Sequence, residues 1–154
     1  MANDGGPGPD LSRRLGYLLM HAQQRMTELT SRALAPFGID GRELGVLVVI
    51  AGHEPGSQLQ VAQRLGVDRT TMVALLDTLE AKGLISRHPH AGDRRRNVVE
   101  LTSAGRDTLR RGAEAGEAAE RAFLAPLSPQ AAQGLRNSLQ AVATHPDSER
   151  LKNA

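Results

Sequence analysis

Residues 57–83, SQLQVAQRLGVDRTTMVALLDTLEAKG, predict two short helices joined by a tight turn. The first begins at a capping box, in which the side chains of Ser57 and Gln60 satisfy free backbone N–H groups. It covers residues 58–65 and ends at Gly66, a residue type that adopts the left-handed conformation common after helices. Both ends of this helix are therefore marked by local sequence.

The second helix is predicted over residues 69–82, with Asp68 as its cap and Gly83 as its end. Its apolar side chains recur at i, i+3, i+4 and i+7 and form one stripe: Met72, Leu75, Leu76 and Leu79. Away from that stripe lie Arg69, Thr70, Val73, Ala74 and Asp77. Two short helices joined by a Gly-Val-Asp turn are typical of a helix-turn-helix.

A β-hairpin is predicted directly after the second helix. Residues 84–88, LISRH, form a short strand, and residues 96–102, RNVVELT, alternate well enough for its partner. Between them PHAGDR, residues 89–94, carries Pro and Gly turn signals. Three consecutive arginines stand between the end of this turn and the start of the second strand: Arg94, Arg95 and Arg96. Because their charges repel one another, we expect a negative group nearby.

Helices are also predicted on the N-terminal side. Asp10 can cap a helix over residues 11–34, which the sequence APFG stops. Asp40 and Glu43 resemble a capping box for a helix over residues 41–53, which breaks at EPG.

On the C-terminal side, Thr102 or Ser103 can cap a long helix over residues 104–124, and Ser128 with Pro129 begins a last helix. The long helix contains GAEAGEAAERA, whose small side chains bury little surface alone but let another backbone come close. We therefore expect the outer helices to pack against a second chain. The alternative is a solvent-exposed Ala/Glu helix.

Composition excludes several classes of protein. The 154 residues are 40% apolar and 23% charged, as expected for a soluble globular domain. No cysteine is present, which excludes disulfides, thiolate nucleophiles and cysteine zinc sites. No apolar run approaches the roughly 20 residues that span a bilayer, and the N-terminus lacks a signal-peptide pattern. We expect a cytoplasmic protein without a membrane partner.

The net charge of +2 is unevenly placed along the chain. Residues 57–112 carry 10 Lys and Arg against 6 Asp and Glu, whereas the remainder has 9 against 11. The positive charge is therefore concentrated on the helix-turn-helix and the hairpin.

The segment LQVAQRLGVDRTTMVALLDTLEAKGLISRHPHAGDRRRNVVELTSAGRDTL, residues 59–109, resembles MarR-type winged helix-turn-helix regulators. LDTLEAKGLISR, the DRR at 93–95 and the LTSAGRD that follows keep the family's residue types, order and spacing. Any one of these matches is weak, but the three in register are specific.

The resemblance implies a mainly α fold with a small β-hairpin wing. Residues 11–143 then form a single MarR-like domain. Within it, residues 40–102 are a winged helix-turn-helix DNA-binding lobe, and residues 11–35 and 104–143 are N- and C-terminal dimerisation helices. Residues 1–10 are predicted to be a flexible N-terminus and residues 144–154 a flexible tail.

The resemblance also implies a function. A homodimer would bind a pseudo-palindromic operator in double-stranded DNA, with a recognition helix in the major groove and the wing in an adjacent minor groove. The chain would be a transcriptional repressor, released when a small aromatic or anionic effector binds between its lobes. One alternative is a ligand-independent architectural DNA-binding protein. Another, a winged helix used only for protein contacts, is disfavoured by the arginines of the wing.

DNA contacts are predicted from both helices of the motif and from the wing. By the family match Arg95 is the residue that enters the minor groove, where Arg is attracted by concentrated negative potential, and Asp93 orients a neighbouring guanidinium. Strand alternation would place Arg94 and Arg96 on one face and Arg95 on the other. The predicted set is Ser57, Gln58, Arg69, Thr70, Thr71, Val73, Ala74, Lys82, Arg87, Asp93, Arg94, Arg95 and Arg96.

The predicted recognition helix departs from the common family pattern. Relatives often carry Arg at positions 74 and 78, where this chain has Ala74 and Thr78, and Val73 replaces a polar residue. Two major-groove contacts are therefore missing. We expect base readout to rest on Arg69, Thr70 and apolar contacts, and the wing to carry more of the affinity.

A ligand pocket is expected where the first helix, the second helix and the lobe meet. The candidates are polar residues on otherwise apolar helices: Tyr17, His21, Arg25 and His53. His21 and Arg25 are one helical turn apart and can bind an anion jointly. A structural or surface role is the alternative for each.

Enzymatic and metal-dependent functions are not expected. His88 and His90 flank Pro89, but zinc needs three or four converging ligands and no cysteine completes a set. The sequence contains no nucleophile-base-acid constellation and no phosphate-binding glycine loop. No cofactor is therefore predicted.

Overall fold

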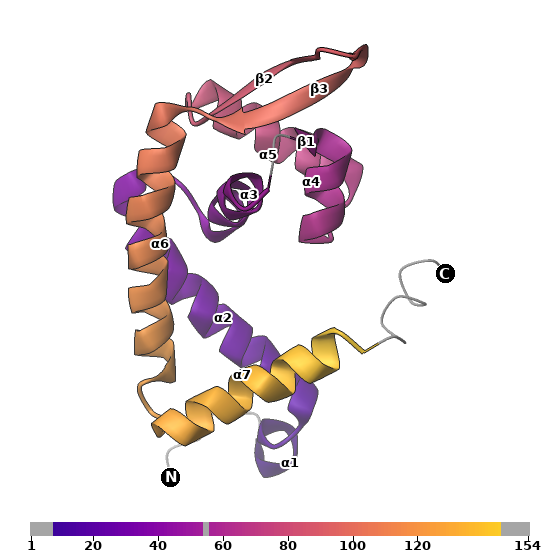
Figure 1. The fold of residues 1–154 in the computed structure, drawn as a ribbon. Helices are drawn as coiled ribbons and strands as arrows, with labels where there is room; N and C mark the ends of the chain where they lie inside the picture. The colour runs from indigo at the N-terminus through magenta and orange to yellow at the C-terminus, as the bar shows by residue number, and fades with distance from the viewer. Residues whose placement is uncertain (1–7, 54–55, 146–154) are drawn as a thin grey trace. The chain divides into compact units, whose positions relative to one another are not determined.

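The computed structural model describes residues 8–53 and 56–145, which divide into two compact units, residues 1–120 and 121–154 (Figure 1). The first unit holds the helix-turn-helix, the sheet and most of the long helix α6; the second holds the end of α6 and α7. The elements in chain order are α1 (Gly8–Ser12), α2 (Leu15–Leu34), the 3-10 turn η1 (Ala35–Phe37), α3 (Gly41–Ala51), β1 (Gly56–Ser57), α4 (Gln58–Leu65), α5 (Arg69–Ala81), β2 (Ile85–His90), β3 (Asp93–Leu101), α6 (Ser103–Leu124) and α7 (Pro129–Ala143).

The predicted helix-turn-helix is confirmed as α4 and α5. Gln60 N–H donates to Ser57 Oγ at 3.3 Å and Ser57 N–H donates to Gln60 Oε1 at 2.9 Å, which closes the capping box. Gly66 has φ +66°, the left-handed conformation that ends α4. Thr71 N–H donates to Asp68 Oδ1 at 2.8 Å and fixes the start of α5.

The core of the first unit lies where α3, α4 and α5 meet the sheet. α3 packs against α4, α5 and β3, and α5 packs against β2. The side chains that fill this core are fully buried aliphatic groups, as the scarcity of aromatic residues requires: Val46, Leu47, Met72, Leu76, Leu79 and Val99. Burying each of the larger ones stabilises the fold by about 2 kcal/mol. The apolar stripe predicted along α5 thus faces inward.

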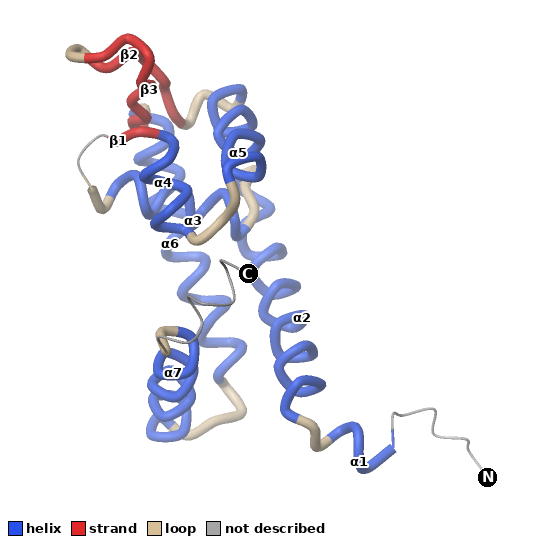
Figure 2. Tube along the Cα trace, turned by 90° about the vertical axis from the view of Figure 1, so that its right-hand side faces the viewer, coloured by secondary structure: helices blue, strands red, loops and turns tan. Residues whose placement is uncertain are grey.

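The sheet is larger than predicted. It has three antiparallel strands in the order β1-β3-β2, because Gly56 and Ser57 pair with Val99 and Val98 (Figure 2). β2 and β3 also extend farther than predicted, so that only Ala91 and Gly92 remain as the turn between them. β2, β3 and this turn form the wing.

The N-terminal helix was predicted wrongly as one element. Residues 13 and 14 interrupt it, so that α1 ends at Ser12 and α2 begins at Leu15. Asp10 lies inside α1 and does not cap a helix at residue 11. The flexible ends and the EPG break were predicted for segments that mostly lie in residues 1–7, 54–55 and 146–154, outside the described part; residues 8–10 are helical.

The N-terminus of α6 is joined tightly to the base of the wing. Thr102, not Ser103, caps the helix: its Oγ1 accepts from Gly105 N–H at 3.0 Å and donates to the carbonyl of Gly83 at 2.6 Å. Thr102 N–H also donates to the carbonyl of Leu84 at 3.1 Å. A Cβ atom at position 105 would overlap that same carbonyl, so only glycine allows this approach.

Part of the small-residue stretch of α6 is covered within the chain. Gly112 is buried, and a Cβ there would lie 3.3 Å from Ile39 Cδ1 and Leu44 Cδ1. Gly116 also faces Leu44. We expected this stretch to pack against a second chain, but these two glycines instead let α6 approach the first unit's own core.

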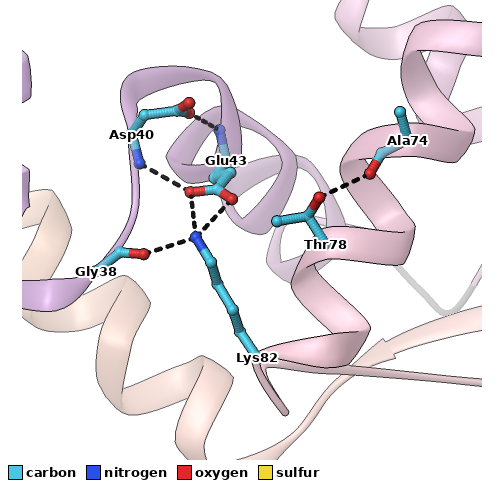
Figure 3. Close-up of polar contacts among 6 residues, drawn as sticks. All are labelled: Gly38, Asp40, Glu43, Ala74, Thr78 and Lys82. Carbon is cyan, nitrogen blue, oxygen red and sulfur yellow. Dashed lines mark hydrogen bonds and ion pairs between the residues drawn. The ribbon is translucent and has the colours of Figure 1, made fainter.

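An ion pair between an exposed lysine and a buried carboxylate joins the end of α5 to the start of α3 (Figure 3). Glu43 is 5% exposed and completes the predicted capping box with Asp40, whose N–H donates to Glu43 Oε2 at 2.9 Å. Lys82 Nζ donates to both oxygens of Glu43, at 2.8 and 3.0 Å, and to the carbonyl of Gly38 at 2.7 Å. Lys82, predicted as a phosphate contact, thus has three protein acceptors.

Two general findings concern residues 8–53 and 56–145. No helix there combines the length and apolar character needed to cross a bilayer. No group of three His, Asp or Glu side chains there is arranged to hold a metal ion.

Gly105→Ala is expected to lower the free energy of unfolding by about 3 kcal/mol, because the new methyl group must displace a backbone carbonyl. Urea denaturation measures the change. The matched control is Gly116→Ala, whose Cβ meets Leu44 Cδ2 at an ordinary 3.4 Å and which should leave stability equal or slightly higher. Equal stability of the two variants would contradict the close approach at Leu84.

Lys82→Ala is expected to lower the free energy of unfolding by about 2 kcal/mol, because it leaves the buried carboxylate of Glu43 with only its capping-box partners. Arg64→Ala is the control, since Arg64 is an exposed cation on α4. Chemical denaturation at neutral pH compares the two. A stability loss no larger than that of the Arg64 variant would show that the pair does not hold α5 in place.

Candidate nucleic-acid interface

One exposed face of α5 carries the residues predicted to read DNA. Arg69, Thr70, Val73, Ala74 and Asp77 line one shallow depression on that face. The polar groups lie at its two ends, with apolar side chains between them. This face is open along its length, as a helix entering a major groove requires.

Thr71 has a structural role at the start of α5. Its hydroxyl donates to Asp68 Oδ2 at 2.6 Å, and this bond with that of the Thr71 N–H holds the pKa of the Asp68 carboxyl below its usual range. The hydroxyl hydrogen is thereby committed to the cap. The DNA contact predicted for Thr71 has no free donor in this arrangement.

Predicted residues from three segments converge at a hollow beside this face. Ser57 and Gln58 come from the start of α4, Arg69 from α5, and Arg95 and Arg96 from β3. Asn97 lines the same hollow and was not predicted as a contact. Its place next to the three arginines is the signal that could have identified it. The hollow brings hydroxyl, amide and guanidinium donors together with no acidic side chain among its lining residues.

The three wing arginines lie in a bulge. β2 and β3 pair regularly from Ile85–Leu101 to Pro89–Asn97, but the next pair is His90–Asp93. Between these two pairs lie four residue steps along β3 but only one along β2. Arg94, Arg95 and Arg96 therefore have no partners on β2. The register shift lies directly after Pro89, which has no N–H group to donate, and prolines within sheets are common at bulges.

The bulge corrects the prediction that neighbouring arginines alternate between faces. Arg95 and Arg96 line the same hollow, which regular alternation would prevent. All three arginines are exposed, and none forms an ion pair with a residue in the described part of the chain. The wing thus presents a dense, unneutralised positive charge.

Asp93 has a different partner from the one predicted. Its Oδ1 accepts from the backbone N–H of Arg95 at 3.0 Å and not from a guanidinium. Across the turn, His90 Nδ1 accepts from Gly92 N–H at 3.0 Å. These two bonds fix the backbone at the tip of the wing and leave the arginine side chains unpaired.

Arg87, near the start of β2, contacts two carboxylates. Its guanidinium donates to Glu80 Oε2 at 2.8 Å, to Asp77 Oδ1 at 2.6 Å and to Gln58 Oε1 at 3.3 Å. The bonds to Glu80 and Asp77 raise the pKa of Arg87 further, and Arg87 holds the pKa of Glu80 below its usual range. Arg87, predicted to contact phosphate, instead ties β2 to α5 and α4.

The four ligand candidates do not form one site. The rings of Tyr17 and His21 are in tilted contact, with centroids 4.1 Å apart and an interplanar angle of 46°, whereas His53 lines a cavity beside α6 with Arg106 and Arg110. Tyr17, His21 and Arg25 do not line that cavity. Its apolar lining comes from Ile50, Leu101 and Leu109, and Glu100 adds one carboxylate. Arg106 and Arg110 were not predicted, although their spacing of four residues on one helix was a signal comparable to that of His21 and Arg25.

Comparisons with known proteins agree with this geometry. The model of the MarR family matches residues 37–96. The transcriptional repressor NicR of Pseudomonas putida is 30% identical over 96 residues, which span 62% of this chain and 61% of that repressor. The chain thus aligns with less than two thirds of the repressor's length.

Solved structures match over most of both chains. A probable transcriptional regulator from Pseudomonas aeruginosa has 31% identity and a TM-score of 0.81, covering 86% of this chain and 98% of its own. The repressor CouR on a 23-mer DNA duplex has 32% identity, a TM-score of 0.83 and coverage of 88% and 96%. CouR from Rhodococcus jostii RHA1 bound to p-coumaroyl-CoA has 28% identity, a TM-score of 0.76 and coverage of 89% and 96%.

These proteins are transcriptional regulators and not enzymes, as the sequence predicted. The mainly helical fold with a small antiparallel wing matches theirs as well. The chain therefore belongs to the MarR family of DNA-binding transcriptional regulators.

Proposed function

We propose that this chain is a homodimeric repressor that binds a pseudo-palindromic operator and leaves it when a small anionic effector binds. One observation carries the DNA-binding part of the proposal. Arg69, Arg95 and Arg96 converge beside the exposed face of α5 without acidic partners. Such a cluster is stabilised by a polyanion, and CouR, whose fold is similar, is known on a DNA duplex.

The interface residues divide into two groups by their bonds. Arg95 enters the minor groove, Arg94 and Arg96 meet flanking phosphates, and Arg69 and Thr70 face the major groove. Ser57 and Gln58 contribute donors at the start of α4. The remaining predicted polar contacts hold the interface in shape through protein partners: Thr71, Lys82, Arg87 and Asp93.

The dimer is supported by apolar side chains exposed on the outer helices. On α2, Leu15 is 71% exposed, and Leu18, Leu19 and Met20 are about half exposed. On α7, Leu139 and Val142 are 46% and 75% exposed. Apolar surfaces of this kind are normally covered, and a second copy of the chain supplies matching surfaces by symmetry. We assign α2 and α7 to dimerisation on this basis, and the resemblance to MarR-type regulators extends the assignment to residues 11–35 and 104–143.

The effector is an aromatic carboxylate or a similar small anion in the cavity beside α6. His53, Arg106 and Arg110 supply positive or donor groups next to apolar side chains, and together they outnumber the single carboxylate of Glu100 in the same lining. CouR is known with p-coumaroyl-CoA, which combines an aromatic acyl group with anionic groups. A DNA-bound regulator of this kind acts in the cytoplasm.

Selection of bound sequences from random duplex DNA tests the proposal. Run with and without aromatic carboxylates, it yields the operator, its symmetry and the effector response. A selected pseudo-palindrome with half-sites about one turn apart, roughly 34–36 Å, supports a symmetric dimer. Enrichment of no sequence would contradict the proposal, and a response to no carboxylate would favour a ligand-independent architectural protein.

Arg95→Ala is expected to weaken binding to the selected operator more than Arg69→Ala does, because α5 lacks arginines at positions 74 and 78. Contacts with ~4 phosphates per subunit would give a slope of about −7 in log Kobs against log salt. Fluorescence anisotropy in a salt series measures the affinity and the slope. Normal binding by the Arg95 variant would contradict the role of the wing, and a flat salt response would contradict the electrostatic contribution.

A further inference from the structure

The recognition helix has few polar groups left for bases. Thr71 Oγ1 donates to Asp68 Oδ2 at 2.6 Å, and Thr78 Oγ1 donates to the carbonyl of Ala74 at 3.0 Å (Figure 3). Asp77 Oδ1 accepts from Arg87 Nη2 at 2.6 Å. On the exposed face, free donors are therefore confined to the first turn, at Arg69 and Thr70.

The middle of that face is apolar. Val73 is 37% exposed and Ala74 is exposed, and both line the depression between the first turn and Asp77. Val73 also lines the neighbouring hollow with Leu59, which is 57% exposed. Unpaired arginines surround this patch: Arg69 on α5 and Arg95 and Arg96 on the wing. Their charge is complementary to DNA, so a nucleic acid is the occupant that the patch fits.

The DNA major groove contains only one kind of group that matches an apolar patch on a protein. Thymine presents a C5-methyl group there beside its O4 acceptor, whereas the other bases present hydrogen-bond donors and acceptors without a methyl group. Val73 and Ala74 would leave such polar edges unpaired and would bury a methyl group favourably. We propose that Val73, with Ala74, selects thymine at the centre of each half-site by contact with its methyl group. This inference rests on the proposed DNA binding.

Replacement of single thymines by deoxyuridine in the selected operator tests the inference. The change removes the major-groove methyl group and leaves the base pairing and the minor groove as they were, so contacts of the wing are unaffected. Loss of one buried methyl group should raise Kd about fourfold when the thymine of one half-site is changed, and about fifteenfold when the thymines of both half-sites are changed. Thymines outside the α5 contact should show no effect.

Val73→Ala identifies the residue that makes the contact. This variant should bind the natural operator more weakly and should lose most of its preference for thymine over deoxyuridine, as coupled partners do in a double-mutant cycle. Val48→Ala is the matched control, since Val48 is a 50% exposed valine on α3 that should keep the full preference. Thermal unfolding by circular dichroism checks that both variants remain folded.

The outcomes separate the two proposals. If random DNA yields no preferred sequence, DNA recognition itself fails. If an operator is found but no thymine responds to deoxyuridine by more than twofold, readout by methyl contact is wrong. A full thymine preference retained by the Val73 variant would also overturn the inference, because another residue would then make the contact.

Discussion

The carboxylate of Glu43 is the constraint on which the placement of the recognition helix depends. Within the described residues it is the one charged side chain that is buried, so its bonds must be satisfied inside the protein. It closes the capping box of α3 and takes two hydrogen bonds from Lys82, at the end of α5. The same ammonium group reaches Gly38 before α3. One buried group thereby ties the start of α3 to the far end of α5, the proposed recognition helix.

Charged residues near the interface follow a clear division. Lys82 and Arg87 are bonded to carboxylates and fix α5 and β2, whereas Arg69 and the wing arginines have no such partners in the described residues. Basic side chains that are already bonded to carboxylates lose little conformational freedom when the protein binds DNA, but they contribute little attraction to the phosphates. Basic side chains without a carboxylate partner keep their full charge and can attract a phosphate backbone. Sequence cannot distinguish the two groups, because both consist of basic residues within one segment.

Local features of the chain were predictable, and distant partnerships were not. The capping boxes at Asp40 and Ser57 are decided by residues three positions apart, and the structure confirms both. By contrast, Glu43 and Lys82 are 39 residues apart, and β1 consists of two residues whose partners lie on β3. The bulge was missed because period-two alternation assumes an unbroken ladder, whereas the register shifts between Pro89 and His90. The DNA-facing set was predicted by resemblance, and the bonds of its members are knowable only from the fold.

The contact between Gly105 and Leu84 has a mechanical consequence. At Gly105 no side chain separates the backbone of α6 from the carbonyl of Leu84, and Thr102 bonds to both Gly83 and Leu84. Because the backbones meet directly at this point, we expect α6 and the wing to move together. A tilt of α6 would then displace the tip of the wing by an amount that increases with the wing's length. In a dimer, the spacing of the two wings would be set by the inclination of the long helices, and a small change far from DNA would move the arginines out of register.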